Sequence, residues 1–192
     1  MIDLIAPDIP GYDHYTAAEK TLTISHDESK NIVTFYYTAL PVTINYTAVL
    51  RDSKATNFGF PSRSSETPAA QSDVAGAQAI PVSGFRFVGW YADALYQQQI
   101  TDSHWFPSNS NHIVPQISFT DSVFDYHYYA LFEPILLTVS QTGMDAETES
   151  CVYEIVNASD TVIATIVITG NTSVTIEQVP AGNYRIREAN GD

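Results

Sequence analysis

The chain has 192 residues, of which 22 are acidic and 8 are basic, so its formal net charge is −14 at pH 7. Nucleic acids and anionic membrane surfaces attract basic proteins, and this charge excludes both as expected partners. The apolar residues are of the types enriched in strands, with 12 Tyr and 9 Phe beside many Val, Ile and Thr. We therefore expect an all-β or β-rich protein with a small α content.

The single cysteine, Cys151, excludes a disulfide within the chain. It alternates with Tyr153 and Ile155, so we expect a thiol that points into the core and is unreactive. The first residues hold no basic stretch before an apolar core, so we expect no signal peptide in them, and the sequence contains no run of about 18 apolar residues that could span a membrane. We expect a segment of a longer protein whose targeting and anchoring parts lie outside it.

The first forty residues are predicted to form a short β segment. Strands are expected at 1–6, 20–25 and 32–38, with a Pro- and Gly-containing loop at 7–14 and a polar turn at 26–31. The run Ala6-Pro7-Asp8-Ile9-Pro10-Gly11-Tyr12, followed by Asn31-Ile32-Val33-Thr34-Phe35-Tyr36-Tyr37, resembles the C-terminal half of mucin-binding-type repeats of bacterial surface proteins. This resemblance implies that residues 1–40 are part of such a repeat.

Residues 41–134 are predicted to form a second β module. In 84–91, side chains alternate between two faces that both carry large apolar groups, so we expect a strand covered on both sides, with Trp90 mostly buried. A stretch rich in Ser, Ala, Pro and Gly, 51–79, is predicted to be a long surface loop. A single helical turn is predicted at 94–100. The other strands are expected at 42–49, 116–120 and 126–132.

The order of these features resembles the internalin-B-type repeat, the Listeria–Bacteroides repeat class. An opening strand is followed by Gly-Phe-Arg-Phe-Val-Gly-Trp-Tyr (84–91), a short turn with Asp93, and a closing strand that ends Tyr-Ala-Leu-Phe (129–132). The segment is longer than a usual repeat because of the 51–79 loop and an insertion at 104–115.

Residues 135–192 are predicted to form a third module, a small β-sandwich. Five short strands follow one another at a spacing of roughly ten residues, which is typical of sandwiches. The run from Val174 to Glu188, with Pro180-Ala181-Gly182-Asn183-Tyr184, resembles the collagen-adhesin B-type domain of Gram-positive surface proteins. This resemblance implies an Ig-like, prealbumin-like sandwich that lacks its last strand. The alternating core is expected to contain Leu137, Val139, Tyr153, Ile155, Ile166, Ile168, Val174, Ile176, Tyr184 and Ile186.

Many domains of that family are cross-linked by an isopeptide bond between Lys and Asn, with a Glu that assists proton transfer. Here Ser140 or Gln141 stands at the Lys position, and Glu188 stands at the Glu position. The sequence has no Lys after Lys54, so we expect no isopeptide bond in this module. Glu188 is then expected to be buried or half-buried and to hydrogen-bond the backbone or an arginine.

No catalytic, cofactor or metal motif is found. The histidines lack helical pairing and Cys partners, and no Asp-x-Asp-x-Asp-Gly loop, Gly-x-Ser-x-Gly turn or phosphate loop occurs. Calcium binding through other loops stays open. Trp105 and Phe106 are candidates for carbohydrate or partner binding, although core packing at a loop base is the more common role of such residues.

Serial short β modules without a catalytic motif favour a structural role, and the three resemblances imply a non-enzymatic structural or adhesive stalk region of a Gram-positive cell-surface protein. It would be extracellular, either attached to the cell wall or secreted, would carry no cofactor, and could meet a host or cell-surface glycan or protein. The alternative is a carbohydrate- or glycoprotein-binding module that uses exposed aromatic residues. An enzyme such as a glycosidase would need two carboxylates that face one cleft, and small serial modules argue against it.

Overall fold

The computed structural model describes residues 2–9, 11–14, 19–51, 54–68, 74–105, 125–144 and 148–189. Within these residues the protein is all-β, which confirms the predicted fold class. The helical element of this part is one 3-10 turn, η1 (Glu28–Lys30), which Asp27 caps by accepting a hydrogen bond from Ser29 N. None of the helical structure in the described ranges is long and apolar enough to cross a membrane.

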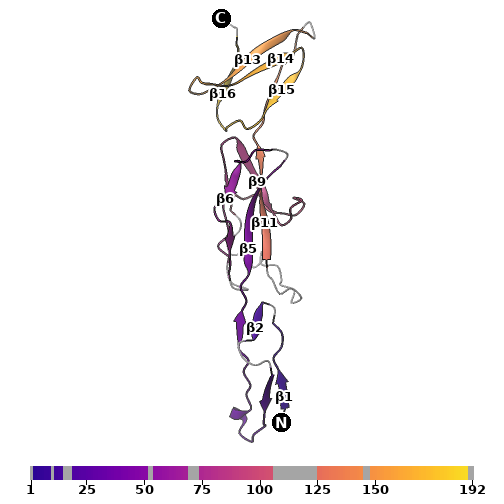
Figure 1. Ribbon diagram of the computed structural model, residues 1–192, viewed down its shortest axis with the longest axis vertical. Helices are drawn as coiled ribbons and strands as arrows, with labels where there is room; N and C mark the ends of the chain where they lie inside the picture. Colours follow the sequence, from indigo (N-terminus) through magenta and orange to yellow (C-terminus); the bar gives the residue numbers. More distant parts are fainter. Residues whose placement is uncertain are drawn as a thin grey trace. The chain divides into compact units, whose positions relative to one another are not determined.

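The chain divides into two compact units, each made of separate stretches of sequence. The first contains 1–47, 61–78 and 90–129, and the second contains 48–60, 79–89 and 130–192. The largest sheet of the described part contributes residues to both units. In spatial order its five strands are β10 (Gln99–Thr101), β9 (Phe85–Tyr91), β11 (Asp125–Pro134), β5 (Thr43–Leu50) and β7 (Ser65–Glu66). Figure 1 labels β9, β11 and β5.

The N-terminal part of the first unit is built from two small antiparallel pairs. Strand β1 (Ile2–Ile5) pairs with β3 (Glu19–Leu22), and β2 (Tyr12–His14) pairs with β4 (Tyr37–Ala39). The loop predicted at 7–14 was therefore wrong for its last three residues, because they pair with β4.

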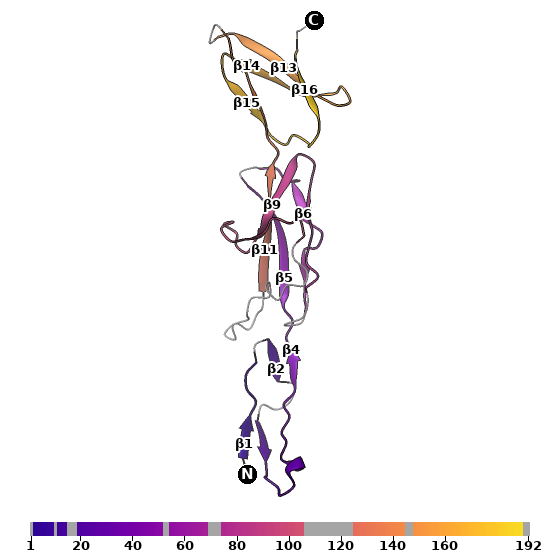
Figure 2. The same cartoon turned by 180° about the vertical axis from the view of Figure 1, so that it is seen from behind.

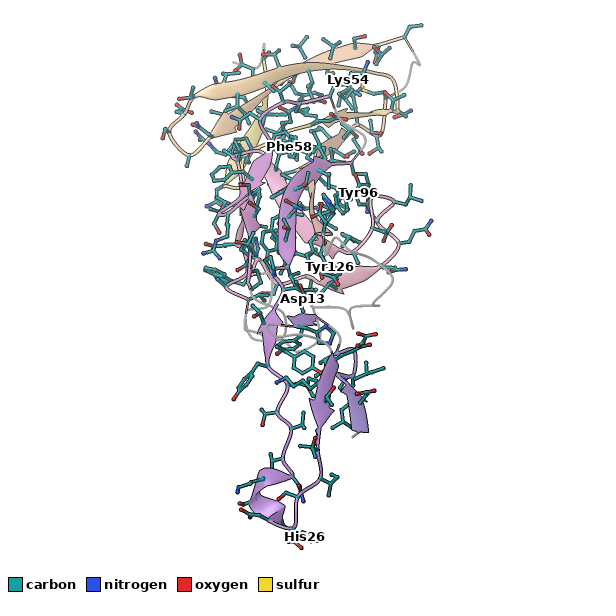
Figure 3. The ribbon with its side chains drawn as sticks, turned by 60° about the horizontal axis from the view of Figure 1, so that its bottom comes forward. Asp13, His26, Lys54, Phe58, Tyr96 and Tyr126 are labelled. Atoms are coloured by element: carbon teal, nitrogen blue, oxygen red, sulfur yellow. The ribbon has the colours of Figure 1, made fainter. Side chains whose placement is uncertain are left out.

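The strand predicted at 32–38 was also largely wrong, since only its last two residues belong to β4. The backbone carbonyl of Thr34 accepts a hydrogen bond from the Lys20 ammonium, at 2.5 Å, rather than from a neighbouring strand. The same ammonium lies 5.3 Å from the ring centre of Phe35 and 5.9 Å from that of Tyr36. His26, labelled in Figure 3, lies in the turn just before η1.

Aromatic side chains from three neighbouring strands form the core of the first unit. Trp90 is fully buried, which confirms the prediction for this residue, and Tyr46 and Tyr128 are buried beside it. The rings of Tyr46 and Trp90 meet edge to face, with centroids 5.7 Å apart and an interplanar angle of 75°. This arrangement is one that aromatic pairs prefer. The two-sided cover predicted for β9 applies at Trp90, whereas Arg86 on the same face is exposed.

The helical turn predicted at 94–100 was wrong. Asp93 organises this segment as a loop, because its carboxylate accepts hydrogen bonds from the backbone amides of Leu95, Gln97 and Gln98 at 2.7–3.2 Å. Burial alone would raise the pKa of Asp93, but these three amide donors lower it overall. Strand β10 then begins at Gln99, and the ring of Tyr96, labelled in Figure 3, lies edge-on to that of Tyr91.

The long loop predicted at 51–79 contains short strands that its small and polar composition concealed. Strand β6 (Gly59–Pro61) pairs with β8 (Ala79–Pro81), and β7 pairs with β5. A second aromatic cluster lies in the second unit, where the Phe132 ring packs against Phe58 and Phe87 at 5.9 and 5.7 Å. Phe58 is labelled in Figure 3. Gly59 is required here, because an added Cβ would lie 2.6 Å from the Phe132 ring.

The C-terminal part of the second unit is a small sandwich of two sheets, visible from both sides in Figures 1 and 2. One sheet pairs β12 (Leu137–Ser140) with β15 (Ser173–Ile176). The other has the order β14 (Val162–Thr169), β13 (Ser150–Asn157), β16 (Tyr184–Glu188). All pairs are antiparallel.

One shared core joins the two sheets of this sandwich. Nine of the ten predicted core positions belong to this core. Four of them are buried, namely Val139, Ile155, Ile166 and Ile168, and five are partly buried, namely Leu137, Tyr153, Val174, Ile176 and Tyr184. Ala164, which was not predicted, packs with them. The exception is Ile186, which is 47% exposed. It lies opposite Ile155, but it belongs to an edge strand of its sheet.

The module boundaries predicted at 40 and 134 stay predictions. Strand β11 ends at Pro134, and β12 begins at Leu137 in a different sheet. The strand predicted at 116–120 lies outside the described residues, as does most of the 104–115 insertion.

Candidate ligand-binding site

Trp105 is an exposed aromatic residue at the end of a described stretch of the first unit. Its side chain is 55% exposed, and it forms an isolated antiparallel bridge with Gln78. The backbone of Gln78 also bonds to Ser62: its carbonyl accepts from Ser62 N at 2.7 Å, and its backbone N–H donates to Ser62 Oγ at 2.9 Å. Residues directly opposite each other in an antiparallel pair share a face of the sheet, so the Gln78 amide side chain accompanies the indole.

The buried Trp90 positions the residue before Trp105. The Trp90 indole Nε1 donates to the backbone carbonyl of His104 at 3.4 Å. The two tryptophans of this chain therefore have different roles, because one is fully buried and the other is more than half exposed. The core contact of the first holds the backbone that presents the second.

A carboxylate anchors the segment that leads to Gln78. The Glu66 carboxylate accepts hydrogen bonds from the backbone amides of Ala75 and Gly76, both at 2.9 Å, and from the Tyr46 hydroxyl at 2.6 Å. Arg63 completes the group with an ion pair of 3.2 Å to Glu66. Gly76 is two residues from Gln78, so the site is tied to the aromatic core through Tyr46.

The environment of Glu66 favours its charged form. Burial alone would raise its pKa, but the hydrogen bonds from Tyr46 and the two backbone amides, with the charge of Arg63, outweigh burial and lower it. Burial and the adjacent Glu66 charge raise the pKa of Tyr46, which therefore stays a hydrogen-bond donor. No sequence pattern indicates this group, because Tyr46 belongs to a predicted strand 20 positions before Glu66, and the other members lie in the stretch predicted as a loop.

An indole face with an amide beside it suits the stacking of a sugar ring. Aromatic faces pack against apolar C–H groups, and amide side chains both donate to and accept from hydroxyl groups. Phe106, the other sequence candidate, lies outside the described residues. Of the two sequence candidates, Trp105 alone lies within the described residues.

The structure separates the residues predicted at the isopeptide position. Ser140 is exposed, whereas Gln141 is buried with 7% exposure. The Gln141 side chain donates from Nε2 to the Gly170 carbonyl at 3.1 Å and accepts at Oε1 from the Tyr153 hydroxyl at 2.9 Å. A neutral amide thus occupies the buried position with both ends hydrogen-bonded.

Glu188 differs from its predicted environment, whereas nothing contradicts the core-facing orientation expected for Cys151. Glu188 is exposed on the edge strand β16, so the expected burial was wrong. Cys151 is a free, half-buried thiol. Within the described ranges, no three His, Cys, Asp or Glu side chains gather into a group that could hold a metal ion.

Sequence reasoning missed one further cluster, in the second unit, where Arg51 and Arg86 both pair with Glu133. The three residues are separated by up to 82 positions, and no spacing rule connects them.

Comparison with protein-family models, with curated proteins and with solved structures finds no match to this chain. The three resemblances stated from the sequence therefore stay predictions.

Proposed function

We propose that this chain is a non-enzymatic structural and adhesive stalk segment of a bacterial cell-surface protein, extracellular and either attached to the cell wall or secreted. The observation that carries the proposal is the bonded connection between the last strand of the large sheet and the C-terminal sandwich. A spacer must hold successive β modules together. Here the connecting residue forms one backbone hydrogen bond to the segment before β9 and another to the sandwich.

Ile135 is the centre of that connection. Its backbone amide donates to the Gly84 carbonyl at 2.8 Å, and its carbonyl accepts from Val179 N at 3.1 Å. Gly84 precedes β9, and Val179 follows β15 in the sandwich. The backbones of these two segments also touch, because a Cβ added at Gly84 would lie 2.5 Å from the Gln178 carbonyl oxygen. A linker bonded in this way resists bending more than a chain with free backbone groups.

The matching sequence resemblances support the same proposal. All three are to repeats or domains of bacterial surface proteins, and the −14 charge suits a soluble exterior surface. The proposed chain works without a cofactor, and its partners are other modules of the parent protein or surface glycans and proteins.

Surface labelling of intact cells tests this proposal. Antibodies raised against the chain should label unpermeabilised cells of the producing organism, and brief protease treatment of the cells should remove the label. Labelling that requires permeabilised cells would refute the proposed location.

Amide ¹⁵N relaxation tests the stalk role: residues 79–89 and 137–189 should share one rotational correlation time, and two clearly different times would contradict a stiff connection.

The second candidate function is carbohydrate or glycoprotein binding at Trp105. It is favoured by the 55% exposure of Trp105, whose backbone bridges to that of Gln78. Because Trp90 is buried, a sugar that stacks on Trp105 should change only the part of the fluorescence that acrylamide can quench. A glycan-array signal that is equal in the native chain and in Trp105→Ala would exclude this site.

A further inference from the structure

A pocket of about 450 Å³ lies in the second unit, where β11 ends. Its walls include Arg51, Arg86, Glu133, Leu136 and Glu177. This volume is within the range of pockets that hold small ligands.

Three neighbouring strands build the charged wall of the pocket. Glu133 is on β11, Arg86 is on the adjacent β9, and Arg51 directly follows β5 on the other side. The Glu133 oxygens are divided between the arginines: Oε1 accepts from Arg51 Nη1 at 2.5 Å, and Oε2 accepts from Arg86 Nη2 at 2.7 Å. The Arg51 backbone amide also donates to the Phe132 carbonyl at 3.0 Å, which holds the backbone of Arg51 beside β11.

This cluster has more positive than negative charge. The other three arginines, Arg63, Arg185 and Arg187, each pair with a carboxylate of their own, whereas Arg51 and Arg86 share one. Glu133 is nearly buried, with 16% exposure, while the arginines are 40% and 63% exposed. Each guanidinium carries five N–H donors in a fixed plane, so most donors of the two arginines are not used by Glu133.

We propose that this pocket binds an acidic sugar, whose carboxylate pairs with Arg86 and Arg51. Arginine forms two parallel hydrogen bonds with a carboxylate, which selects such a group over a neutral one. The site differs from Trp105 in location and in ligand charge, and the proposal does not rest on the stalk function.

The remaining walls explain why the ligand is a sugar and not a simple anion. Glu177 is an exposed carboxylate that can accept hydrogen bonds from hydroxyl groups, which a simple anion does not offer. Leu136 is 57% exposed and offers an apolar surface to the C–H face of a sugar ring. One carboxylate, several hydroxyls and one apolar face are combined in a uronic acid.

Titration of the full-length chain with D-glucuronate, followed by amide NMR shifts, tests the proposal. D-glucose is the neutral control with the same ring, and acetate supplies the carboxylate without the ring. We expect glucuronate to shift the amides of residues 84–88 and 133–136, with weaker binding of both controls. Arg86→Gln should weaken glucuronate binding by about tenfold, the effect of one lost charge-assisted hydrogen bond. Arg185→Gln, a matched change at an arginine outside the pocket, should leave binding unchanged.

Glu133→Gln gives a result of opposite sign. Because Glu133 competes with the ligand for both arginines, removing its charge should strengthen glucuronate binding, provided that the circular dichroism spectrum stays native. If that variant unfolds, Arg51→Gln replaces it and should weaken binding as Arg86→Gln does. Equal binding of glucose and glucuronate would overturn the proposal, as would acetate binding as tight as glucuronate or an unchanged affinity in Arg86→Gln. Failure here would leave the surface-labelling test of the stalk function unaffected.

Discussion

Replacing Gly84 by Ala should loosen the connection around Ile135. Two costs are involved. Gly84 has φ +90°, a conformation that costs a residue with a side chain about 1–3 kcal/mol. The new Cβ would also lie 2.5 Å from the Gln178 carbonyl oxygen and 2.9 Å from its carbon, against the 3.4–4 Å of ordinary contact. Because both neighbours are backbone atoms, the loop itself must move, and overpacking of this kind costs about 1–3 kcal/mol.

Gly143 provides a matched control. Its φ is +86°, nearly that of Gly84, but nothing lies within 4 Å of an added Cβ. Gly143→Ala therefore carries the conformational cost without the collision. The difference between the two variants, about 1–3 kcal/mol, is the energy of the close approach alone.

Urea unfolding of both variants measures this difference, and hydrogen exchange locates it. In Gly84→Ala, the movement of the Gly84 carbonyl should break its 2.8 Å hydrogen bond from Ile135 N, so exchange at the Ile135 amide should become faster. In Gly143→Ala, this amide should keep its native protection. Equal destabilisation of the two variants, with Ile135 still protected in both, would refute the close approach and weaken the argument for a stiff stalk.

Three further predictions concern stability and covalent structure. Trp90→Ala should destabilise the protein by about 3–5 kcal/mol in urea unfolding, because it removes a fully buried aromatic ring. Trp105→Ala should cost much less, and similar costs for both would contradict the buried core. Glu66→Gln should lower the midpoint of thermal unfolding at pH 7. The folded-state pKa of Glu66 lies below its ordinary 4.5, so its contribution is complete above that pH and is lost as the pH falls through the folded value. The gap between native and variant midpoints should therefore close in acid, and a gap that widens there would be incompatible with this network. The intact mass of the purified chain should equal the sequence mass, whereas a deficit of one ammonia or one water within residues 135–192 would reveal the cross-link that we do not expect.

The strands of the C-terminal sandwich were predictable because each has one buried face. Alternation then records burial directly, as at Val139, Ile155 and Ile166. Ile186 has the same pattern and failed, since alternation indicates which face a side chain occupies but not whether the opposite sheet reaches it. Residues 32–36 failed for a related reason: strand-forming side chains do not supply a pairing partner.

The candidate sites were less predictable than the fold. Trp105 was a sequence candidate for binding, with core packing as the more common alternative, and its exposure in the structure leaves the binding role a prediction. Neither its partner Gln78 nor the support from Glu66 could be inferred, because both depend on pairing between distant short strands. The Arg51–Glu133–Arg86 cluster has the same origin, since only the order of β9, β11 and β5 brings its members together.

The buried amide of Gln141 has a consequence for how the protein responds to its surroundings. Its hydrogen bonds to Gly170 and Tyr153 join neutral groups, so dissolved salt does not weaken them directly. The charged cluster at Glu133 is more exposed on its arginine side and is screened as ionic strength rises. High ionic strength should therefore weaken the Glu133 cluster while leaving the buried Gln141 hydrogen bonds inside the sandwich unchanged.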